Sequence, residues 1–509
     1  MGIIPFRVKI AFIYFPFSVE IPIIYFPFRV NRISHMSWIT NQPKHSKKIK
    51  KRKKMTTTFK RYKYKEILEW KQNTQGTRAL LIEGARRVGK STIAKNFAQN
   101  EYGSHLIIDF SIADNEIKSL FTDYRNDINK FFSYLEAYTG THLQERNSVI
   151  VFDEVQRHPP AREFIKQLVA DGKYDYIETG SLISIKKNVE SIVIPSEERV
   201  LDLNPLNFDE FLLALEQDSL SALIKESYNT KTPLPEPIHQ KAQRLFREYM
   251  LVGGMPQAVE KYIETNNFGE VDTVKRDILN LYNFDIEKFG GIDAKRIKRI
   301  FQTLPGQLAK HEKKYTLSAL DKNARSREYA DAFFWLEDSR IVNNCLNATD
   351  PNVGLSASAD DSKFKCYMAD TGLLASHAFQ DSANTPHEIY RDILQGKLEL
   401  NEGMFTENVV AQQLKSAGHK LYFYSKRDDK NSKNTMEIDF LISKAYESSG
   451  KLRITPIEVK SSKRYRTSSL DKFKAKFKRR VGTRYVLHPR PMQIEEDIIK
   501  LPLYMAHCL

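Results

Sequence analysis

The segment from Arg78 to Ala98 constrains the fold of this chain more than any other stretch. It has the sequence RALLIEGARRVGKSTIAKNFA, in which an apolar run, Ala79 to Ile82, leads into a glycine-bounded loop and then into a helix-compatible segment. The loop fills the pattern GxxxxGK followed by Ser or Thr, in which backbone N–H groups and a helix N-terminus hold phosphates. The sequence therefore predicts an α/β fold built on a P-loop NTPase parallel sheet.

Contacts to the nucleotide are expected along the whole loop. Its residues are Gly84, Ala85, Arg86, Arg87, Val88, Gly89, Lys90, Ser91 and Thr92. The glycines let the backbone approach closely. Lys90 is predicted to reach the β and γ phosphates, and Ser91 to ligate Mg²⁺.

A second element supports the motif, because a bare match can be accidental. Ser148 to Glu154 (SVIVFDE) is a β-branched and aromatic run that ends in two carboxylates, as expected of a buried parallel strand with functional residues at its C-terminal edge. Asp153 is predicted to hold Mg²⁺, usually through water, and Glu154 to orient or activate the attacking water. The other interpretation, a core strand ending in two solvated acids, is disfavoured by the P-loop upstream.

Three further residues are candidates with open alternatives. The predicted strand Tyr174 to Glu178 is followed by Thr179 and Ser181, whose hydroxyls could sense the γ-phosphate, although Thr-Gly-Ser is also an ordinary turn. Arg199 could supply positive charge to the transition state, in cis or in a neighbouring subunit. A surface arginine is at least as good an explanation.

Length and cysteine content bound the architecture. A chain of 509 residues exceeds one hydrophobic core and predicts roughly three or four units of domain size. Cys345, Cys366 and Cys508 are the only cysteines and form no CxxC pair, so neither a disulfide framework nor a zinc site is indicated. We expect the cytoplasm as the compartment.

The net charge of +16 is unevenly distributed. Residues 1–54 carry +11 and residues 451–484 another +11, which leaves the rest at about −6. The first segment also repeats PFRV, PFSV and PFRV at a period of eleven residues, with a proline in each copy. We expect translation to start at Met55 or Met36 and residues 1–54 to lie outside the native fold. A membrane-surface or nucleic-acid-binding arm is the alternative.

With these residues in view, the chain resembles a family of uncharacterised prokaryotic AAA-type P-loop ATPases that carry a C-terminal region of unknown function. The resemblance covers about Phe59 to Val486. It rests on LLIEGARRVGKST (80–92), VIVFDEVQRHP (149–159), ETGSL (178–182), LNPLNFDEF (203–211), YMLVGGMPQAV (249–259), ENVVAQQL (407–414), EIDFLIS (437–443) and PIEVKSS (456–462). The resemblance is also the basis for expecting ATP and not GTP, because no residue in the sequence identifies the base of the nucleotide.

The resemblance also marks Gln156 and the GGMP sequence at 253–256 as signature positions, and we expect GGMP to form a turn between helices. It implies a winged-helix-like unit near residues 290–345. Leu304 to Leu308, Thr316 to Leu320 and Tyr329 to Leu336 have apolar residues at helical spacing, which core packing explains as well as DNA binding does.

A second candidate site lies near Glu437. Alternation predicts a strand with Met436, Ile438 and Phe440 on one face and Glu437 and Asp439 on the other. The segment from Ile454 to Lys460 repeats this pattern, with Ile457 and Val459 opposite Glu458 and Lys460.

Two such strands would present Asp439, Glu458 and Lys460 together. This resembles the PD-(D/E)xK nuclease core, in which carboxylates hold Mg²⁺ and the lysine positions or activates water. Glu407 matches its helical acid, so Glu407, Asp439 and Glu458 are the predicted metal ligands. Ile438 replaces the usual proline, and an ordinary half-exposed hairpin would show the same alternation.

A basic segment follows directly and would suit a phosphate backbone. It contains Lys463, Arg464, Arg466, Lys472, Lys474, Lys476, Lys478, Arg479 and Arg480. Tyr465, Phe473 and Phe477 are interleaved with these cations, and the phenylalanines fit either base stacking or the core face of a helix.

The predicted domains are an AAA-type ATPase (55–215), a helical lid or connector (216–285), a winged-helix-like segment (286–350), a linker with helices (351–400) and a restriction-endonuclease-like α/β domain (401–509). We expect ATP and Mg²⁺ as cofactors, no membrane association, and DNA or a second copy of the chain as candidate partners. Two functions fit: an ATP-dependent, DNA-acting enzyme with nuclease potential, or a nucleotide-switched binding or regulatory protein whose nuclease-like domain is non-catalytic.

Overall fold

In the residues that it describes, the computed structural model contains two β-sheets with helices around them. The structure describes residues 58–181, 196–310, 314–315, 326–381, 385–395, 402–426, 435–445 and 450–509. The expectations for residues 1–54 and for Thr316 to Leu320 concern segments outside these ranges. Among the described residues, no helix is both long and apolar enough to cross a membrane.

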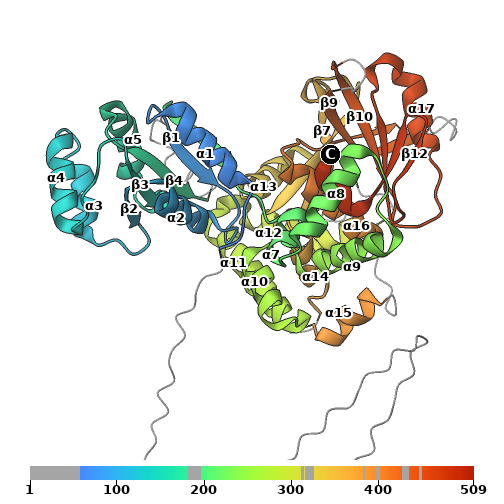
Figure 1. The fold of residues 1–509 in the computed structure, drawn as a ribbon, viewed down its shortest axis with the longest axis horizontal. Coiled ribbons are helices and arrows are strands. Elements are labelled where there is room, and N and C mark those ends of the chain that lie inside the picture. Colours follow the sequence, from blue (N-terminus) through green and yellow to red (C-terminus); the bar gives the residue numbers. More distant parts are fainter. Residues whose placement is uncertain are drawn as a thin grey trace, which may run out of the picture. The chain divides into compact units, whose positions relative to one another are not determined.

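The first sheet is entirely parallel, as predicted, and its strands follow the order β2-β3-β4-β1-β5 (Figure 1). The strands are β1 (Ala79–Glu83), β2 (Ser104–Asp109), β3 (Ser148–Asp153), β4 (Asp175–Gly180) and β5 (Glu198–Asp202). Every residue of β1, β3 and β4 is buried, because helices cover both faces of a parallel sheet.

Helices pack on both faces of this sheet. They are α1 (Lys63–Thr74), α2 (Lys90–Glu101), α3 (Asn115–Asp123), α4 (Ile128–Thr139) and α5 (Pro159–Asp171). Successive β3 side chains alternate between two cores: Val151 joins the core that contains Phe97 of α2, whereas Phe152 joins the core that contains Phe164 of α5. Asp153 follows Phe152 as the last residue of this buried strand.

A helical region follows. Its elements are α7 (Phe208–Ala214), α8 (Asp218–Thr230), α9 (Glu236–Val252), α10 (Pro256–Thr265), α11 (Phe268–Phe289), α12 (Ala294–Leu308) and α13 (Ser326–Asp338). The predicted GGMP turn is confirmed, since α9 ends at Val252 and α10 begins at Pro256. The patches Leu304 to Leu308 and Tyr329 to Leu336 lie in α12 and α13.

The second sheet has the order β12-β13-β11-β10-β9-β8-β6-β7. Its strands are β6 (Val342–Ala348), β7 (Ala359–Met368), β8 (Tyr422–Lys426), β9 (Met436–Ala445), β10 (Leu452–Val459), β11 (Arg484–His488), β12 (Gln493–Glu495) and β13 (Ile498–Pro502). The antiparallel pair β6–β7 joins it through parallel pairing of β6 with β8. The domain boundaries expected at residues 350 and 401 therefore lie between strands of one sheet. The sequence did not indicate this, because pairing between distant segments leaves no local signal.

Helices cover this sheet as well. Of the remaining helices, α16 (Glu402–Ser416) and α17 (Ser468–Phe477) contact its strands, whereas α14 (Thr371–Ala378) and α15 (His387–Leu394) pack mainly on other helices. Short 3-10 helices occur elsewhere along the chain, at Val155–Arg157, Gly291–Asp293, Leu355–Ser358, Lys478–Arg480 and Leu503–Cys508. Phe440 and Ile457 share a core with Val409 of α16. Ile438 and Ile454 share a different core with α17.

The expected alternation along β9 fails at Asp439. Tyr422 pairs with Leu441 but Tyr424 pairs with Ile438, so β9 contains one extra residue at this point. Such a bulge redirects side chains. Phe440 consequently lies in the α16 core instead of sharing a core with Ile438.

Candidate functional site

The glycine-bounded loop connects β1 to α2. Gly84 has φ +157°, and a Cβ there would lie 2.4 Å from the carbonyl oxygen of Leu203. Gly89 caps α2 with φ +100°, a conformation that favours glycine. The free N–H groups at the start of α2 therefore face the loop that precedes it, which is the arrangement that binds phosphates.

Lys90 is the first residue of α2 and is buried. Its ammonium donates hydrogen bonds of 3.0 Å to the carbonyls of Gly84 and Ala85. Burial lowers the pKa of Lys90 to about 8, while the nearby carboxylates of Glu154 and Asp153 oppose this shift. The ammonium thus lies within the phosphate loop, held by two of the loop carbonyls.

Asp153 lies across the loop at the end of β3. Its Oδ1 accepts hydrogen bonds from Ser91 Oγ at 2.6 Å and from Thr179 Oγ1 at 2.5 Å. Thr179 is at the end of β4, which lies between β1 and β3. Lys95, one helical turn after Ser91, places its Nζ 3.2 Å from Asp153 Oδ2.

These residues fit Mg²⁺. A hydroxyl and a buried carboxylate are hard oxygen donors of the kind that Mg²⁺ prefers, and they already lie within hydrogen-bonding distance of each other beside the phosphate loop. Ser91 and Asp153 would hold the ion. The bound ion would supply positive charge that neutralises the phosphates.

Glu154 follows in the left-handed region with φ +56°. Its Oε2 accepts a 2.7 Å hydrogen bond from Nε2 of Gln156, which is buried. Thr179 Oγ1 accepts the Glu154 backbone N–H at 3.3 Å. Gln156 thus has a concrete role that the sequence did not supply, namely to orient the Glu154 carboxylate.

A cleft of about 520 Å³ opens beside these groups, within the range of ligand sites. The predicted residues that line it are Arg86, Arg87, Gly89, Lys90, Ser91, Thr92, Asp153 and Glu154. Gly84, Ala85 and Val88 form the inner part of the loop, and Thr179 lies behind Asp153. Sequence reasoning missed Arg61, Lys95, Arg157 and Gln257, which also line the cleft.

Arg61 contacts the LNPLNFDEF stretch (203–211). Its guanidinium pairs with Glu210 Oε1 at 3.2 Å and donates to the carbonyls of Val88 and Asn204. Glu210 also completes a capping box with Asn207 at the start of α7. These contacts fasten the phosphate loop to the segment that follows β5.

Contacts also join the loop to the helical region. Arg86 Nη1 pairs with Asp285 Oδ1 of α11 at 2.6 Å. Pro256, the first residue of α10, lies 3.5 Å from where a Gly89 Cβ would stand. The GGMP turn therefore places the start of α10 against the phosphate loop.

The same turn is hydrogen-bonded to the part of the chain that carries the second sheet. The Gly254 N–H donates to Asp370 Oδ2 at 2.6 Å, and a Cβ at Gly254 would lie 2.0 Å from the Leu206 carbonyl. Gln412 of α16 donates to the same Asp370 oxygen at 3.2 Å. One buried carboxylate thus links the turn beside the cleft to α16.

Two predicted residues lie away from the cleft lining. Arg199 is in β5 and pairs in register with Leu80, three residues before the end of β1. At about 3.3 Å per residue this places it roughly 10 Å from the carboxyl edge where the loop begins. Ser181 follows β4 and is not among the residues that line the cleft.

The second predicted constellation divides into two groups. Lys365 of β7 lies among three carboxylates, with its Nζ 2.9 Å from Glu437 Oε1, 3.5 Å from Asp439 Oδ1 and 3.7 Å from Glu407 Oε2. Sequence reasoning missed Lys365, which lies outside the motifs that suggested the site.

Glu458 belongs to the other group, where Oε2 pairs with Lys460 Nζ at 2.8 Å. Burial raises the pKa of Glu458, and Lys460 opposes the rise. Burial also raises the pKa of Asp439, with a contribution from the Glu407 carboxylate and opposition from Lys365. No group of three or more His, Cys, Asp or Glu side chains in the described part of the chain is arranged to hold a metal ion.

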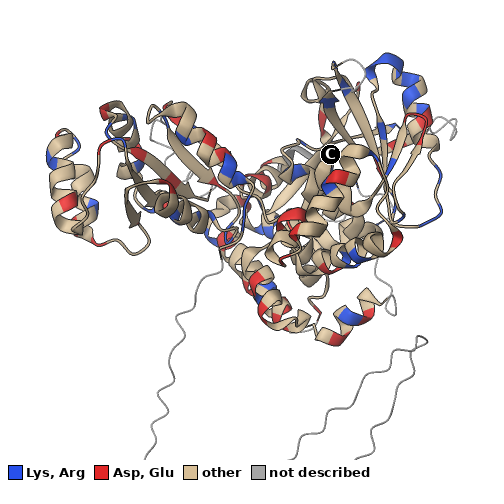
Figure 2. Ribbon diagram, in the orientation of Figure 1, with Lys and Arg blue, Asp and Glu red and all other residues tan. Residues whose placement is uncertain are grey.

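The basic segment lies on and around α17, where Figure 2 shows Lys and Arg gathered. Lys463, Arg464, Arg466, Lys474, Lys476, Lys478, Arg479 and Arg480 are exposed. Phe473 and Phe477 are buried in the sheet core and pack against each other and Tyr424, so they serve the helix core and not base stacking. The two phenylalanines are therefore not available on the exposed surface, where the cations lie beside the exposed Asp471.

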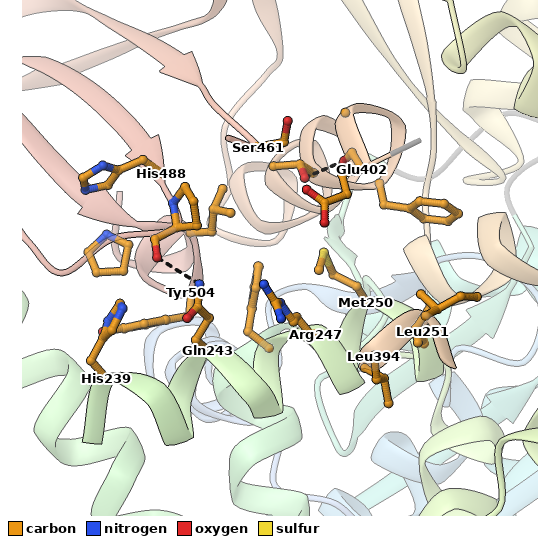
Figure 3. A pocket seen from close by; sticks show the side chains of 18 of the residues that line it. His239, Gln243, Arg247, Met250, Leu251, Leu394, Glu402, Ser461, His488 and Tyr504 are labelled. Carbon is orange, nitrogen blue, oxygen red and sulfur yellow. Dashed lines mark hydrogen bonds between the residues drawn. The ribbon is translucent and has the colours of Figure 1, made fainter. Parts of the chain in front are cut away.

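A second cavity of about 600 Å³ lies between α9 and the carboxyl ends of β11 and β13 (Figure 3). His239 contacts the Tyr504 hydroxyl at 3.0 Å, and Gln243 donates to the Pro489 carbonyl at 2.9 Å. Arg247 and Glu402 are the charged residues that line it. None of the predicted site residues borders this cavity, so the nucleotide cleft remains the candidate site.

A parallel sheet with a phosphate loop after β1, an acidic pair after β3 and Thr179 between them defines a P-loop NTPase fold. Comparison with known proteins gives the particular type. Residues 76–212 match an AAA domain, residues 243–384 match a domain of unknown function (DUF8612), and residues 402–504 match a second domain of unknown function (DUF4143). No curated protein matches the chain.

Similar solved structures include a Walker-type ATPase of Pyrococcus abyssi, with 14% identity over 63% of this chain and 96% of that chain and a TM-score of 0.37. Cdc6p of Pyrobaculum aerophilum has 11% identity over 68% and 97%, with a TM-score of 0.28. The ORC1 protein of Aeropyrum pernix, in complex with DNA, has 10% identity over 64% and 94%, with a TM-score of 0.26. The AAA domain match, and not these distant likenesses, assigns residues 76–212 to an AAA-type ATPase domain.

Proposed function

We propose that this protein is a Mg²⁺-dependent ATPase whose nucleotide state controls a DNA-binding C-terminal domain. The observation that carries the ATPase part is the hydrogen bond between Ser91 and Asp153 beside a buried Lys90. It brings together the hydroxyl, the carboxylate and the ammonium that phosphoryl transfer requires. These three groups come from α2 and β3, so the match to the motif extends to geometry.

Each side chain has a distinct task in this proposal. Lys90 and the first N–H groups of α2 bind the terminal phosphates. Glu154, oriented by Gln156, holds the attacking water in line with the γ-phosphate. Arg87, Lys95 and Arg157 add positive charge around the same cleft.

The contacts beyond the cleft support a switch. Arg86 reaches α11, and α10 begins against Gly89 and is tied through Gly254 and Asp370 to Gln412 of α16. A nucleotide that moves the phosphate loop or α10 would bias the position of α16 through these contacts. ATP binding and hydrolysis would then alter the second sheet that α16 covers.

The exposed cations on and around α17 support DNA as the partner. A DNA backbone supplies regularly spaced phosphates, and lysine and arginine side chains that neutralise them release counterions. Few acids offset this surface: Lys474 pairs with Asp497 at 2.6 Å and Arg480 with Asp350 at 2.7 Å. The remaining cations are available for phosphate contacts that position DNA without selecting a sequence.

The ATPase proposal is tested by phosphate release from the full chain. We expect Mg²⁺-dependent hydrolysis, no ATP binding by Lys90→Ala, and retained ATP binding with hydrolysis reduced about 10²- to 10⁴-fold in Glu154→Gln. Tight MgATP binding by Lys90→Ala would refute the phosphate site. Undiminished turnover by Glu154→Gln would remove Glu154 from its task.

The DNA proposal is tested by measuring affinity at several salt concentrations. Replacing Lys463, Arg464 and Arg466 with serine should weaken binding of a duplex and reduce the slope of log K against log salt by about 0.9 for each lost phosphate contact. A matched control replaces the exposed Lys65, Lys241 and Lys295, and the N-terminal basic tract is present in both. Equal losses in both variants would exclude the α17 surface as the DNA site.

A further inference from the structure

Lys365 is a buried cation inside the carboxylate cluster of the second sheet. Its side chain is 1% exposed, and its ammonium lies 2.9 to 3.7 Å from oxygens of Glu437, Asp439 and Glu407. An ammonium has three N–H donors, one for each of these carboxylates. The aromatic ring of Phe423, 5.3 Å from Nζ, closes another side.

Other groups of the protein engage the same carboxylates. Tyr367 donates its hydroxyl proton to Glu407 Oε2 at 3.0 Å, the oxygen that also faces Lys365, and the Val459 N–H donates to Asp439 Oδ2 at 2.9 Å. Glu437 Oε2 lies 3.8 Å from Lys314 Nζ. Groups of the protein therefore already contact one oxygen of Glu407 and both oxygens of Glu437 and Asp439.

We propose that Lys365 is a built-in cation that takes the place of a divalent metal ion in this cluster, so that the C-terminal domain acts without metal-dependent phosphodiester cleavage. The DNA-binding role of that domain rests on the function proposed above. The inference that the cluster holds no metal ion does not depend on that proposed function, because it follows from the position of Lys365 alone.

Mg²⁺ and the Lys365 ammonium would compete for the same position. Mg²⁺ requires oxygens at about 2.0–2.1 Å in near-octahedral geometry. The ammonium occupies the point toward which the Glu407, Glu437 and Asp439 carboxylates converge, and it would repel a dication strongly. It also neutralises one charge of a cluster whose affinity for a metal depends on negative charge.

Lys365 is held in this position by its strand. It pairs in register with Cys345 of β6, and both residues are buried within the sheet. This pairing fixes the backbone of Lys365, and its side chain is 1% exposed, so the stem and the ammonium lie within the fold. Because β7 lies outside the region that resembles a nuclease core, the lysine is supplied from a separate part of the chain.

The test measures Mn²⁺ binding to the nucleotide-free full chain by electron paramagnetic resonance. Wild-type protein and Asp439→Asn should bind the same number of Mn²⁺ ions. Lys365→Met should gain one ion, and Lys365→Met combined with Asp439→Asn should lose it again. Mn²⁺ that is bound by wild-type protein and lost in Asp439→Asn would overturn the proposal.

Two further measurements keep the result decisive. If Lys365→Met does not fold, Lys365→Met with Glu437→Gln removes one of the carboxylates left without its cation and should still gain Mn²⁺ relative to Glu437→Gln alone. Incubation of wild-type protein with duplex DNA and Mn²⁺ should leave the DNA intact. Cleavage that Asp439→Asn abolishes would show an active nuclease, whereas absent DNA binding with unchanged Mn²⁺ results would reject only the DNA role.

Discussion

The nucleotide cleft and the carboxylate cluster of the second sheet use the same kinds of side chain differently. In each, a lysine ammonium approaches a largely buried aspartate, at 3.2 Å for Lys95 and Asp153 and at 3.5 Å for Lys365 and Asp439. Lys95 is 39% exposed on a helix at the rim of a cleft, whereas Lys365 is 1% exposed within a sheet. Lys95 is therefore in contact with water, whereas Lys365 is almost wholly shielded from it.

This difference shows that carboxylates near a lysine do not by themselves define a metal site. Desolvation decides the outcome, because a buried ammonium cannot leave its carboxylates without losing all compensation for its charge. At the cleft, the neutral Ser91 hydroxyl lies beside Asp153 and would complete the donor set for the proposed Mg²⁺. In the carboxylate cluster, the Lys365 ammonium supplies the positive charge that a metal ion would otherwise supply.

The largest expected effect compares the two lysines in stability. Lys365→Met should lower the free energy of unfolding by about 3–5 kcal/mol near neutral pH, since it leaves Glu407, Glu437 and Asp439 without their shared cation. Lys95→Met should cost less than about 1 kcal/mol, because that pair is partly exposed. Denaturant unfolding of both variants measures the difference.

The pH dependence of the Lys365→Met deficit provides a check of the cause. Burial raises the pKa of Asp439 and the Lys365 ammonium lowers it, so removal of the ammonium leaves the ionised carboxylates to repel one another. Protonation relieves this repulsion, and the deficit should shrink as the pH falls toward about 5. Besides the three carboxylates, Lys314, Lys460 and the Tyr367 hydroxyl face this cluster. A deficit that does not change with pH would indicate lost packing and not lost charge.

A smaller effect concerns the pH dependence of ATP binding. The Lys90 pKa of about 8 means that the ammonium loses its proton as the pH rises through this value. Phosphates bind the charged form, so affinity should fall by at most about tenfold for each further pH unit. Calorimetric titration between pH 7 and pH 9.5 measures this fall, and Lys90→Arg should bind without it because arginine stays charged.

The smallest expected effect isolates the positioning of Glu154. Gln156→Ala should lower kcat about tenfold and leave KM unchanged, because the Glu154 carboxylate loses its orienting donor while the phosphate contacts remain. Steady-state phosphate release measures both constants. In a Glu154→Gln background the same change should have little further effect, and additive losses would show that Gln156 acts independently of Glu154.

The nucleotide site was largely predictable because its parts are local. The loop from Gly84 to Ser91 and the strand ending at Asp153 can each be recognised from fewer than a dozen consecutive residues. Lys95 was also within reach, since Ser91 and Lys95 are four residues apart on one helix face. Arg61 was not, because its contacts with Glu210 and Asn204 join segments more than 140 residues apart.

The second sheet was less predictable for the same reason. Alternation located β9 and β10, but a bulge at Asp439 moved Phe440 into the other core. The β6–β7 pair came from a region expected to contain a winged-helix-like segment and a linker, and nothing in its sequence indicates that it completes this sheet. Lys365 lies on β7 of this pair, so its place in the carboxylate cluster was not predicted either.

The sequence by itself determined the phosphate loop, the acidic strand end and the chemistry that these two motifs can hold. Local patterns suffice there, because a glycine-bounded turn and a helix N-terminus bind phosphate wherever they fold. Only the tertiary structure decided which cation each buried carboxylate meets. Pairing of β7 with β6, a contact that the sequence does not encode locally, put an ammonium where the carboxylate pattern alone had suggested a metal.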